Sequence, residues 1–85
     1  MMSDEMLGSI KLFAGDWEPQ YWRFCNGQSV KQKDFVALAS VLGIHLPEGV
    51  EYEDLEGEFN LPNLESPQEG LNYIICINGH YPARR

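Results

Sequence analysis

The sequence predicts an α+β fold, with a small antiparallel or mixed sheet that contains a β-hairpin and packs against one helix. Three observations predict it: short apolar segments with strand-like patterning, an Asn-Gly pair between two of them, and one stretch with the apolar period of a helix. The chain has 85 residues, the length of one small domain. We therefore expect residues 1–85 to form a single domain.

The first predicted strand covers residues 9–13, where apolar and polar residues mix with a period close to two. This period is typical of a strand with one buried face, and Ala14-Gly15-Asp16 ends the pattern. We expect this strand to open the fold.

The second and third strands are predicted within residues 21–30, on either side of Asn26-Gly27. An Asn-Gly pair between apolar runs is a strong hairpin signal, because both residues tolerate a positive φ. We therefore expect the two strands to meet at this turn.

The one predicted helix covers residues 31–43. Its apolar residues follow the i, i+3, i+4, i+7 spacing of one helix face, namely Phe35, Leu38, Ala39 and Leu42. Gly43 suits a left-handed C-terminal cap. Lys31 and Lys33 at its start do not complement the helix dipole, so the buried face must hold this helix.

The second half of the chain predicts an acidic loop over residues 45–57 and an extended edge segment at 59–64. Pro62 favours an edge position for the latter because it lacks an amide donor. The final strand, residues 72–78, is apolar on both faces from Tyr73 to Ile77, so we expect it at the centre of its sheet.

We expect these elements to enclose one core. Strand alternation places Trp22 and Phe24 on the same face, with Tyr21 and Arg23 on the other. The predicted core residues are Trp22, Phe24, Phe35, Leu38, Leu42, Tyr73 and Ile75.

Composition excludes several classes of function. The formal charge of −7 opposes a phosphate backbone, so we predict no nucleic-acid partner. The longest apolar-rich run, residues 35–42, is far shorter than a membrane span, and we predict no membrane association. Residues 1–6 lack the features of a signal peptide, which predicts synthesis in the cytoplasm.

No catalytic or metal-binding motif is visible, and we predict no cofactor. His45 and His80 have no neighbouring ligand at metal-site spacing. The spacing of Cys25 and Cys76 permits a disulfide, although a chain without a leader favours reduced thiols. A nucleophilic role for Cys25 is less favoured than a packed thiol beside a turn.

The candidate binding residues are two aromatic side chains and an acidic group: Trp17, Tyr21, Glu51, Glu53, Asp54 and Glu56. The acidic residues fit a solvated loop that faces a protein partner better than a calcium site, since their spacing lacks the Asp-x-Asp-x-Asp-Gly pattern. Nothing places Glu56 and Glu58 across a cleft as a hydrolytic pair. Trp17 and Tyr21 are the aromatic residues we expect to be exposed, and they could stack on sugar rings.

Taken together, the motifs resemble the phage tail collar family, whose bacterial members include microcystin-dependent proteins. The most specific parts are Trp-x-x-Cys-Asn-Gly-Gln at residues 22–28 and Asn-Tyr-Ile-Ile at residues 72–75. The remaining segments that carry the resemblance are residues 8–15, Pro19, residues 38–43, residues 59–64 and residues 76–84.

The chain departs from the family pattern at three places. Tyr21 stands where the pattern has Gly before the Trp, and Asn63 replaces an Asp. The longer variable segment of relatives, which begins with Arg-Gly-Arg, is missing between Leu64 and Leu71. The chain therefore resembles a minimal version of the family scaffold.

The resemblance implies a non-enzymatic structural or accessory protein of a phage tail, tail fibre or phage-derived particle, which acts by binding a protein and can form homo-oligomers. It also implies a place in a virion or phage-like particle. Two alternatives remain open: a module that binds carbohydrate or another cell-surface ligand, and a free-standing bacterial regulator or inhibitor that docks a basic protein.

Overall fold

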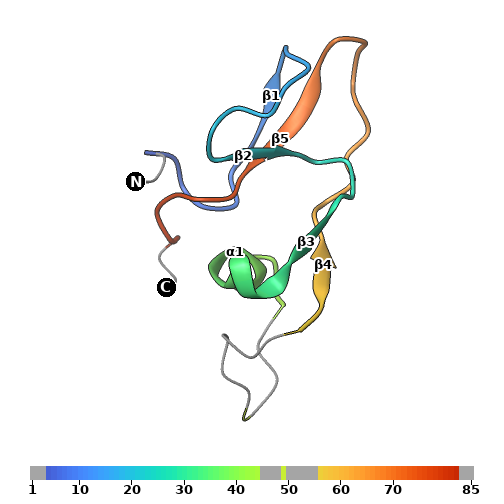
Figure 1. Ribbon diagram of the computed structural model, residues 1–85. Coiled ribbons are helices and arrows are strands. Elements are labelled where there is room, and N and C mark those ends of the chain that lie inside the picture. Colours follow the sequence, from blue (N-terminus) through green and yellow to red (C-terminus); the bar gives the residue numbers. More distant parts are fainter. Residues whose placement is uncertain (1–3, 45–48, 50–55, 83–85) are drawn as a thin grey trace.

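A computed structural model describes residues 4–44, 49 and 56–82. It contains a three-stranded antiparallel sheet of order β1-β5-β2, a separate two-stranded antiparallel sheet of β3 and β4, and a short helical segment (Figure 1). The predicted α+β class is confirmed. The elements in chain order are β1 (Ile10–Phe13), β2 (Trp22–Phe24), β3 (Ser29–Lys31), the 3-10 helix η1 (Gln32–Asp34), α1 (Val36–Val41), β4 (Glu58–Asn60) and β5 (Asn72–Cys76).

Strand β5 lies at the centre of the larger sheet, as its continuous apolar character predicted. It pairs antiparallel with β1 on one side, with Ile10 opposite Ile75, and with β2 on the other, with Trp22 opposite Cys76. Ile74, Ile75 and Cys76 have no exposed surface. A strand covered on both faces reads as an unbroken apolar run, so its position follows from its sequence.

The predicted hairpin at Asn26-Gly27 is wrong in its pairing. Strand β2 pairs with β5 and strand β3 pairs with β4, so the segments on either side of the turn belong to different sheets. In Figure 1 the chain leaves the upper sheet after β2 and continues into β3, beside α1. Tertiary pairing with later strands has overridden the local hairpin signal.

The Asn-Gly pair nevertheless forms a tight turn. Gly27 has a φ of 77°, and the Asn26 side-chain oxygen accepts a hydrogen bond from the Gln28 amide at 3.1 Å. The Gly27 amide donates to the Pro62 carbonyl, and the Asn63 side chain lies against Gly27. The turn therefore redirects the chain from one sheet to the other, where the segment after β4 holds it.

The predicted helix over residues 31–43 is shorter and divided. Residues 32–34 form a 3-10 turn, Phe35 has a non-helical φ of −135°, and α1 starts only at Val36. The C-terminus agrees with the prediction: Gly43 has a φ of 87° and donates to Ser40, while the Ile44 amide donates to the Ala39 carbonyl. These two bonds form a Schellman cap.

Among the described residues, two apolar clusters replace the single core that we expected. One lies on the face of the β1-β5-β2 sheet that α1 and the β3-β4 sheet cover, and it contains Leu38, Phe59, Leu61 and Ile75 among its buried members. The other lies on the opposite face, around Trp22, Ile74 and Cys76. Because successive residues of a strand point to opposite faces, the two-sided apolar strand β5 supplies both clusters.

The predicted core residues are divided between these clusters. Trp22, Leu38 and Ile75 are buried. Phe35, Leu42 and Tyr73 are partly buried against the cluster of Ile75, whereas Phe24 is partly buried against the cluster of Trp22.

Strand β1 is more exposed than its alternating pattern predicted. Ile10 and Leu12 share the sheet face of Ile75 and Tyr73, yet they retain 42% and 46% of their surface. The helix α1 and the β3-β4 sheet, which cover this face, do not extend over β1.

The two cysteines are free thiols that are both buried. Cys25 belongs to one cluster and Cys76 to the other, so the sheet separates them. Burial raises the pKa of the Cys25 thiol above its ordinary value, because the thiolate loses its hydration.

This raised pKa predicts a loss of stability at alkaline pH. The thiol of the unfolded chain ionises first, so the contribution of Cys25 is complete below the ordinary pKa of about 8.5 and is lost as the pH rises toward the folded-state value. Urea unfolding between about pH 7 and about pH 10 should show a decline in the free energy of unfolding that is shallower in Cys25→Ala. Equal slopes for the two proteins would contradict the assignment to Cys25.

No helix in the described part of the chain has both the length and the apolar character needed to cross a bilayer.

Candidate binding cleft

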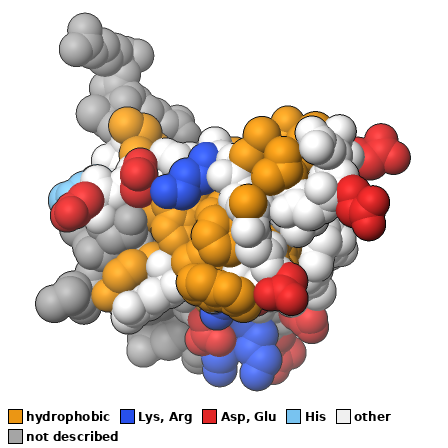
Figure 2. Space-filling view, turned by 90° about the horizontal axis from the view of Figure 1, so that it is seen from above, with side chains coloured by type: hydrophobic (Ala, Val, Ile, Leu, Met, Phe, Trp, Pro, Cys, Tyr) orange, Lys and Arg blue, Asp and Glu red, His pale blue; other side chains and the backbone are white. Residues whose placement is uncertain are grey.

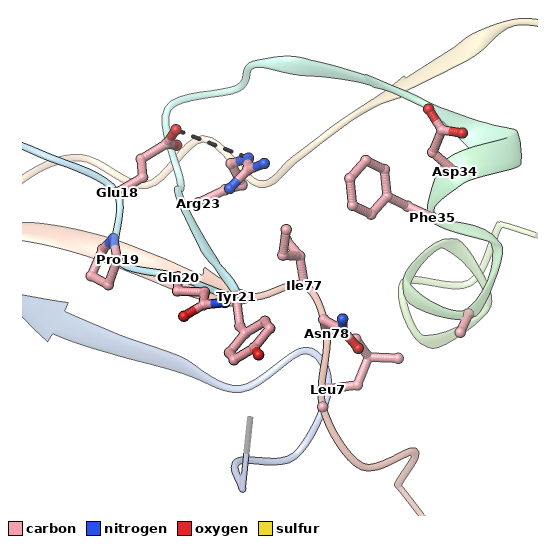
Figure 3. Close-up of a pocket in the computed structure, with 12 residues that line it drawn as sticks. Leu7, Glu18, Pro19, Gln20, Tyr21, Arg23, Asp34, Phe35, Ile77 and Asn78 are labelled. Atoms are coloured by element: carbon pink, nitrogen blue, oxygen red, sulfur yellow. Dashed lines mark ion pairs between the residues drawn. The ribbon is translucent and has the colours of Figure 1, made fainter. Parts of the chain in front are cut away.

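A cleft of about 540 Å³ opens between the larger sheet and the start of the helical segment. Four stretches of the chain that are far apart in sequence form its walls (Figure 3). The lining residues are Leu7, Glu18, Pro19, Gln20, Tyr21, Arg23, Asp34, Phe35, Ala37, Ile77, Asn78 and Gly79. Its volume falls within the range of small-ligand and side-chain pockets.

Arg23 forms the charged part of the sheet wall. It lies on β2 opposite Ile75, on the face that is turned toward the cleft. Its guanidinium Nε is 4.0 Å from the Glu18 carboxylate, and Nη1 donates to the Trp22 carbonyl at 3.0 Å. The Arg23 side chain is 35% exposed, so its guanidinium is fixed in place and still accessible to a ligand.

Phe35 forms the opposite wall. It occupies the break between η1 and α1, which turns its ring toward the sheet, and Asp34 lies beside it at the rim (Figure 3). Ile77, which follows β5, lies between the Arg23 and Phe35 sides in this view. The cleft thus combines an apolar floor and wall with one guanidinium.

Glu18 organises the strand that carries Arg23. One of its carboxylate oxygens accepts hydrogen bonds from the Phe24 amide and from the Gln28 side-chain amide, both at 2.8 Å. Gln28 also donates to the Phe24 carbonyl at 3.0 Å. These bonds explain why an acid precedes the Trp22 segment and why a Gln follows the turn.

Tyr21 has an unusual backbone conformation. Its φ is 74°, the only positive φ of a non-glycine residue in the described ranges. A bulky residue in this region is strained by about 1–2 kcal/mol. The surrounding structure holds it there: the Ile77 amide donates to the Tyr21 carbonyl at 2.8 Å, and the side chain packs against the cluster of Trp22.

The strain at Tyr21 can be measured by comparing Tyr21→Ala with Tyr21→Gly. Both changes remove the phenol ring, but only Gly adopts a positive φ without a steric penalty. We expect Tyr21→Gly to unfold in urea with a free energy about 1 kcal/mol higher than Tyr21→Ala. The same pair of substitutions at Lys11, within β1, should show the reverse order, because Gly weakens an ordinary strand. If Ala is the more stable residue at both positions, Tyr21 is not strained.

The chain also matches an established protein family. Residues 8–67 match the phage tail collar domain, which is more than half of the 85 residues. The chain belongs to the phage tail collar domain family. No curated protein and no solved structure gives a significant match. The family of tail structural domains that the motifs predicted is thereby confirmed.

The residues that match the collar family do not include the whole of the larger sheet. They contain β1 to β4, whereas β5, which pairs with both β1 and β2, follows the match. The Gly that the family pattern has before the Trp agrees with the positive φ found at Tyr21. In this collar domain a bulky residue occupies a backbone conformation that Gly adopts without strain.

The structure separates the residues that we predicted as binding contacts. Tyr21 lines the cleft, but it is partly buried and packs against the cluster of Trp22, so the expectation of an exposed Tyr21 on the face opposite Trp22 is wrong; its positive φ breaks the strand alternation on which that expectation depended. Trp17 does not line the cleft; it is 61% exposed and its ring meets Phe13 edge-on at 5.3 Å. Glu56 is exposed in another region, and Glu51, Glu53 and Asp54 lie outside the described residues.

Sequence reasoning missed Arg23 and Phe35 as site residues. Phe35 was predicted only as a core residue, and Arg23 only as lying on the face opposite Trp22. The alternation of β2 was the available signal for Arg23, since it turns a charged side chain toward the covered face of the sheet.

The described residues hold no group of three or more His, Cys, Asp or Glu side chains that could bind a metal ion. The cleft offers instead an apolar surface, a guanidinium donor and acidic oxygens from Glu18 and Asp34. Such a surface suits recognition of a peptide segment.

Proposed function

We propose that this chain is a non-enzymatic structural or accessory component of a phage tail or phage-derived particle, and that it binds another protein of the particle through the cleft. The match of residues 8–67 to the collar domain carries this proposal, because the family is one of tail structural domains. The cleft adds a physical basis for the contact.

The lining of the cleft suggests the chemistry of the partner. An apolar side chain could pack between Phe35 and Ile77, while a carboxylate or a backbone carbonyl accepts from Arg23. Arginine and aromatic residues at the centre of an interface contribute a large share of binding energy. A partner segment with an apolar anchor next to an acidic or carbonyl group therefore fits best.

The proposal can be tested by incorporation into particles. A tagged chain is expressed in a host that produces the particle, and the fraction that sediments with purified particles is measured. We expect Arg23→Gln to lower that fraction about tenfold, whereas Lys33→Gln, which removes the same charge from an exposed position outside the cleft, should have no effect.

Two results would contradict the proposal. The first is a wild-type chain that is absent from the particles. The second is an equal loss of incorporation in both variants, which would indicate a general effect of charge. A urea-unfolding curve for Arg23→Gln shows whether the variant is folded, since Arg23 also donates to the Trp22 carbonyl.

A carbohydrate-binding role is a second candidate, favoured by the exposure of Trp17. Trp17 is 61% exposed, and its ring is supported edge-on by Phe13, as in a stacking platform. If Trp17 binds carbohydrate, the wild-type chain should bind to glycans on an array, and Trp17→Ala should not. An array without signal for the wild type would dismiss it.

A further inference from the structure

The two outer edges of the three-stranded sheet differ in the hydrogen-bond partners of their outward backbone groups. Strands β1 and β2 both flank β5, so each has one edge that is not paired within this sheet. An unpaired edge exposes a row of amide and carbonyl groups that can pair with another chain.

The outer edge of β2 is fully capped. The Ile77 amide donates to Tyr21 and the Cys25 amide donates to Tyr73, so Trp22 and Phe24 direct their backbone groups away from β5. Every one of these groups has a partner. The Trp22 amide and carbonyl bond to the Pro19 carbonyl and the Arg23 guanidinium, and the Phe24 amide and carbonyl bond to Glu18 and Gln28.

The outer edge of β1 is open. The Cys76 amide donates to the Ser9 carbonyl, so in the alternating antiparallel ladder Lys11 and Phe13 also bond to β5, while Ile10 and Leu12 point away. The outward amides and carbonyls of Ile10 and Leu12 have no hydrogen-bond partner among the residues that the structure describes.

Apolar side chains accompany the open edge. Ile10 and Leu12 are 42% and 46% exposed, and Met6 just before the strand is 53% exposed. Figure 2, which views this end of the molecule, shows hydrophobic side chains gathered across its centre. Proteins usually protect such an edge with charges, Pro or a covering segment, as β2 does with its side-chain caps.

We propose that β1 pairs antiparallel with β1 of a second copy of this chain, about a two-fold axis at Lys11. This register places Ile10 of each copy opposite Leu12 of the other. In this register the outward amide and carbonyl of Ile10 in one copy bond to those of Leu12 in the other, so that the outward groups of both residues are paired. The exposed Ile10 and Leu12 side chains of the two copies then cover one another on one face.

The charges on the other face are compatible with this pairing. Lys11 of the two copies would lie opposite each other, which is unfavourable for a lysine alone. Each Lys11 ammonium, however, is 3.9 Å from its own Glu5 carboxylate and 4.4 Å from the centre of the Trp22 ring. The paired charges cancel locally, so a chain with a charge of −7 can approach its copy at this edge.

Because the strand is short, we expect a weak dimer. Sedimentation equilibrium of the whole chain between about 10 µM and about 1 mM should show a reversible monomer–dimer transition, as interfaces below about 1,200 Å² are generally transient. This test is separate from incorporation into particles, so either proposal can fail without the other.

Leu12→Lys tests the edge directly. It adds a charge to an exposed position of β1, and we expect the dissociation constant of the dimer to rise at least about tenfold. Leu64→Lys is the matched control, since Leu64 is 39% exposed and lies outside the strands. It should leave the dissociation constant unchanged.

Leu12→Pro is a second variant that leaves the ladder to β5 complete. The Leu12 amide points outward, so Pro removes only a donor of the open edge and should also abolish the dimer. A wild-type chain that stays monomeric across the concentration range overturns the proposal, even if it binds a different protein. A dimer that persists in Leu12→Lys also overturns the proposal. The same holds if Leu64→Lys weakens the dimer as much as Leu12→Lys does.

Discussion

Replacing Gly79 with Ala is expected to lower the free energy of unfolding by about 3 kcal/mol, one of the two largest effects that this structure predicts. A Cβ atom at position 79 would collide with the carbonyl oxygen of Glu5 and lie 2.9 Å from Cys76 Sγ. The collision cannot be relieved locally, because the Glu5 carbonyl accepts the His80 amide at 3.0 Å and Leu7 donates to His80 at 2.7 Å. Urea unfolding of the two proteins measures the effect.

Gly70→Ala provides the control for this prediction. Gly70 has a φ of 85° and no atom near the position of an added Cβ, so its substitution incurs the conformational penalty alone, about 1–2 kcal/mol. We expect Gly79→Ala to be clearly the more destabilised variant. Equal losses at the two positions would show that the segment after β5 does not pack closely against residues 5–7.

Ile75→Ala is the second substitution with a large expected effect, a loss of about 3–4 kcal/mol. Ile75 is fully buried on the central strand, between β1 and β2, and packs in the cluster of Leu38 and Leu61. Truncation leaves a cavity that strands paired on both sides cannot close. In a chain of 85 residues such a loss is a large share of the total stability.

The comparison for Ile75→Ala is Leu64→Ala, at a position that is 39% exposed. We expect a loss within about 0.5 kcal/mol there, since surface substitutions rarely matter more. Denaturant unfolding followed by tryptophan fluorescence reports both variants. A loss at position 75 no greater than at position 64 would mean that β5 is not the centre of the fold.

Features that depend on a short stretch of sequence were predicted well. The apolar run of β5 indicates a strand covered on both faces, and Gly43 is found in the left-handed cap that its position after the helical pattern predicted. Strand β4, around Phe59, pairs with β3 in a two-stranded sheet, which agrees with an edge position next to Pro62. Each of these outcomes is decided by nearby residues.

Features that depend on distant partners were not predicted. Whether the strands beside Asn26-Gly27 pair with each other depends on β4 and β5, which follow much later in the chain. The division of the apolar side chains into two clusters likewise depends on which strand lies at the centre. The break at Phe35 has no local signal, because the apolar spacing continues through it.

The candidate cleft was the least predictable part. Its walls come from four separate stretches, and Arg23 and Phe35 face one another only after the sheet has formed. The departure from the family pattern at Tyr21 was visible in the sequence, but the backbone strain at this residue is seen only from its φ of 74° in the structure. Local patterns place a residue on a face of a strand, whereas the cleft depends on what that face meets.

In this collar domain the outer edge of β2 is capped and the outer edge of β1 is open, and we propose that the open edge is used for assembly. Residue-resolved amide hydrogen exchange measured at increasing protein concentration tests it most directly. We expect the Phe24 amide, which donates to Glu18, to be protected at every concentration, and the Ile10 and Leu12 amides to become protected only as the concentration rises. Ile10 and Leu12 amides that exchange equally fast throughout, or that are already protected in the dilute chain, would contradict the claim.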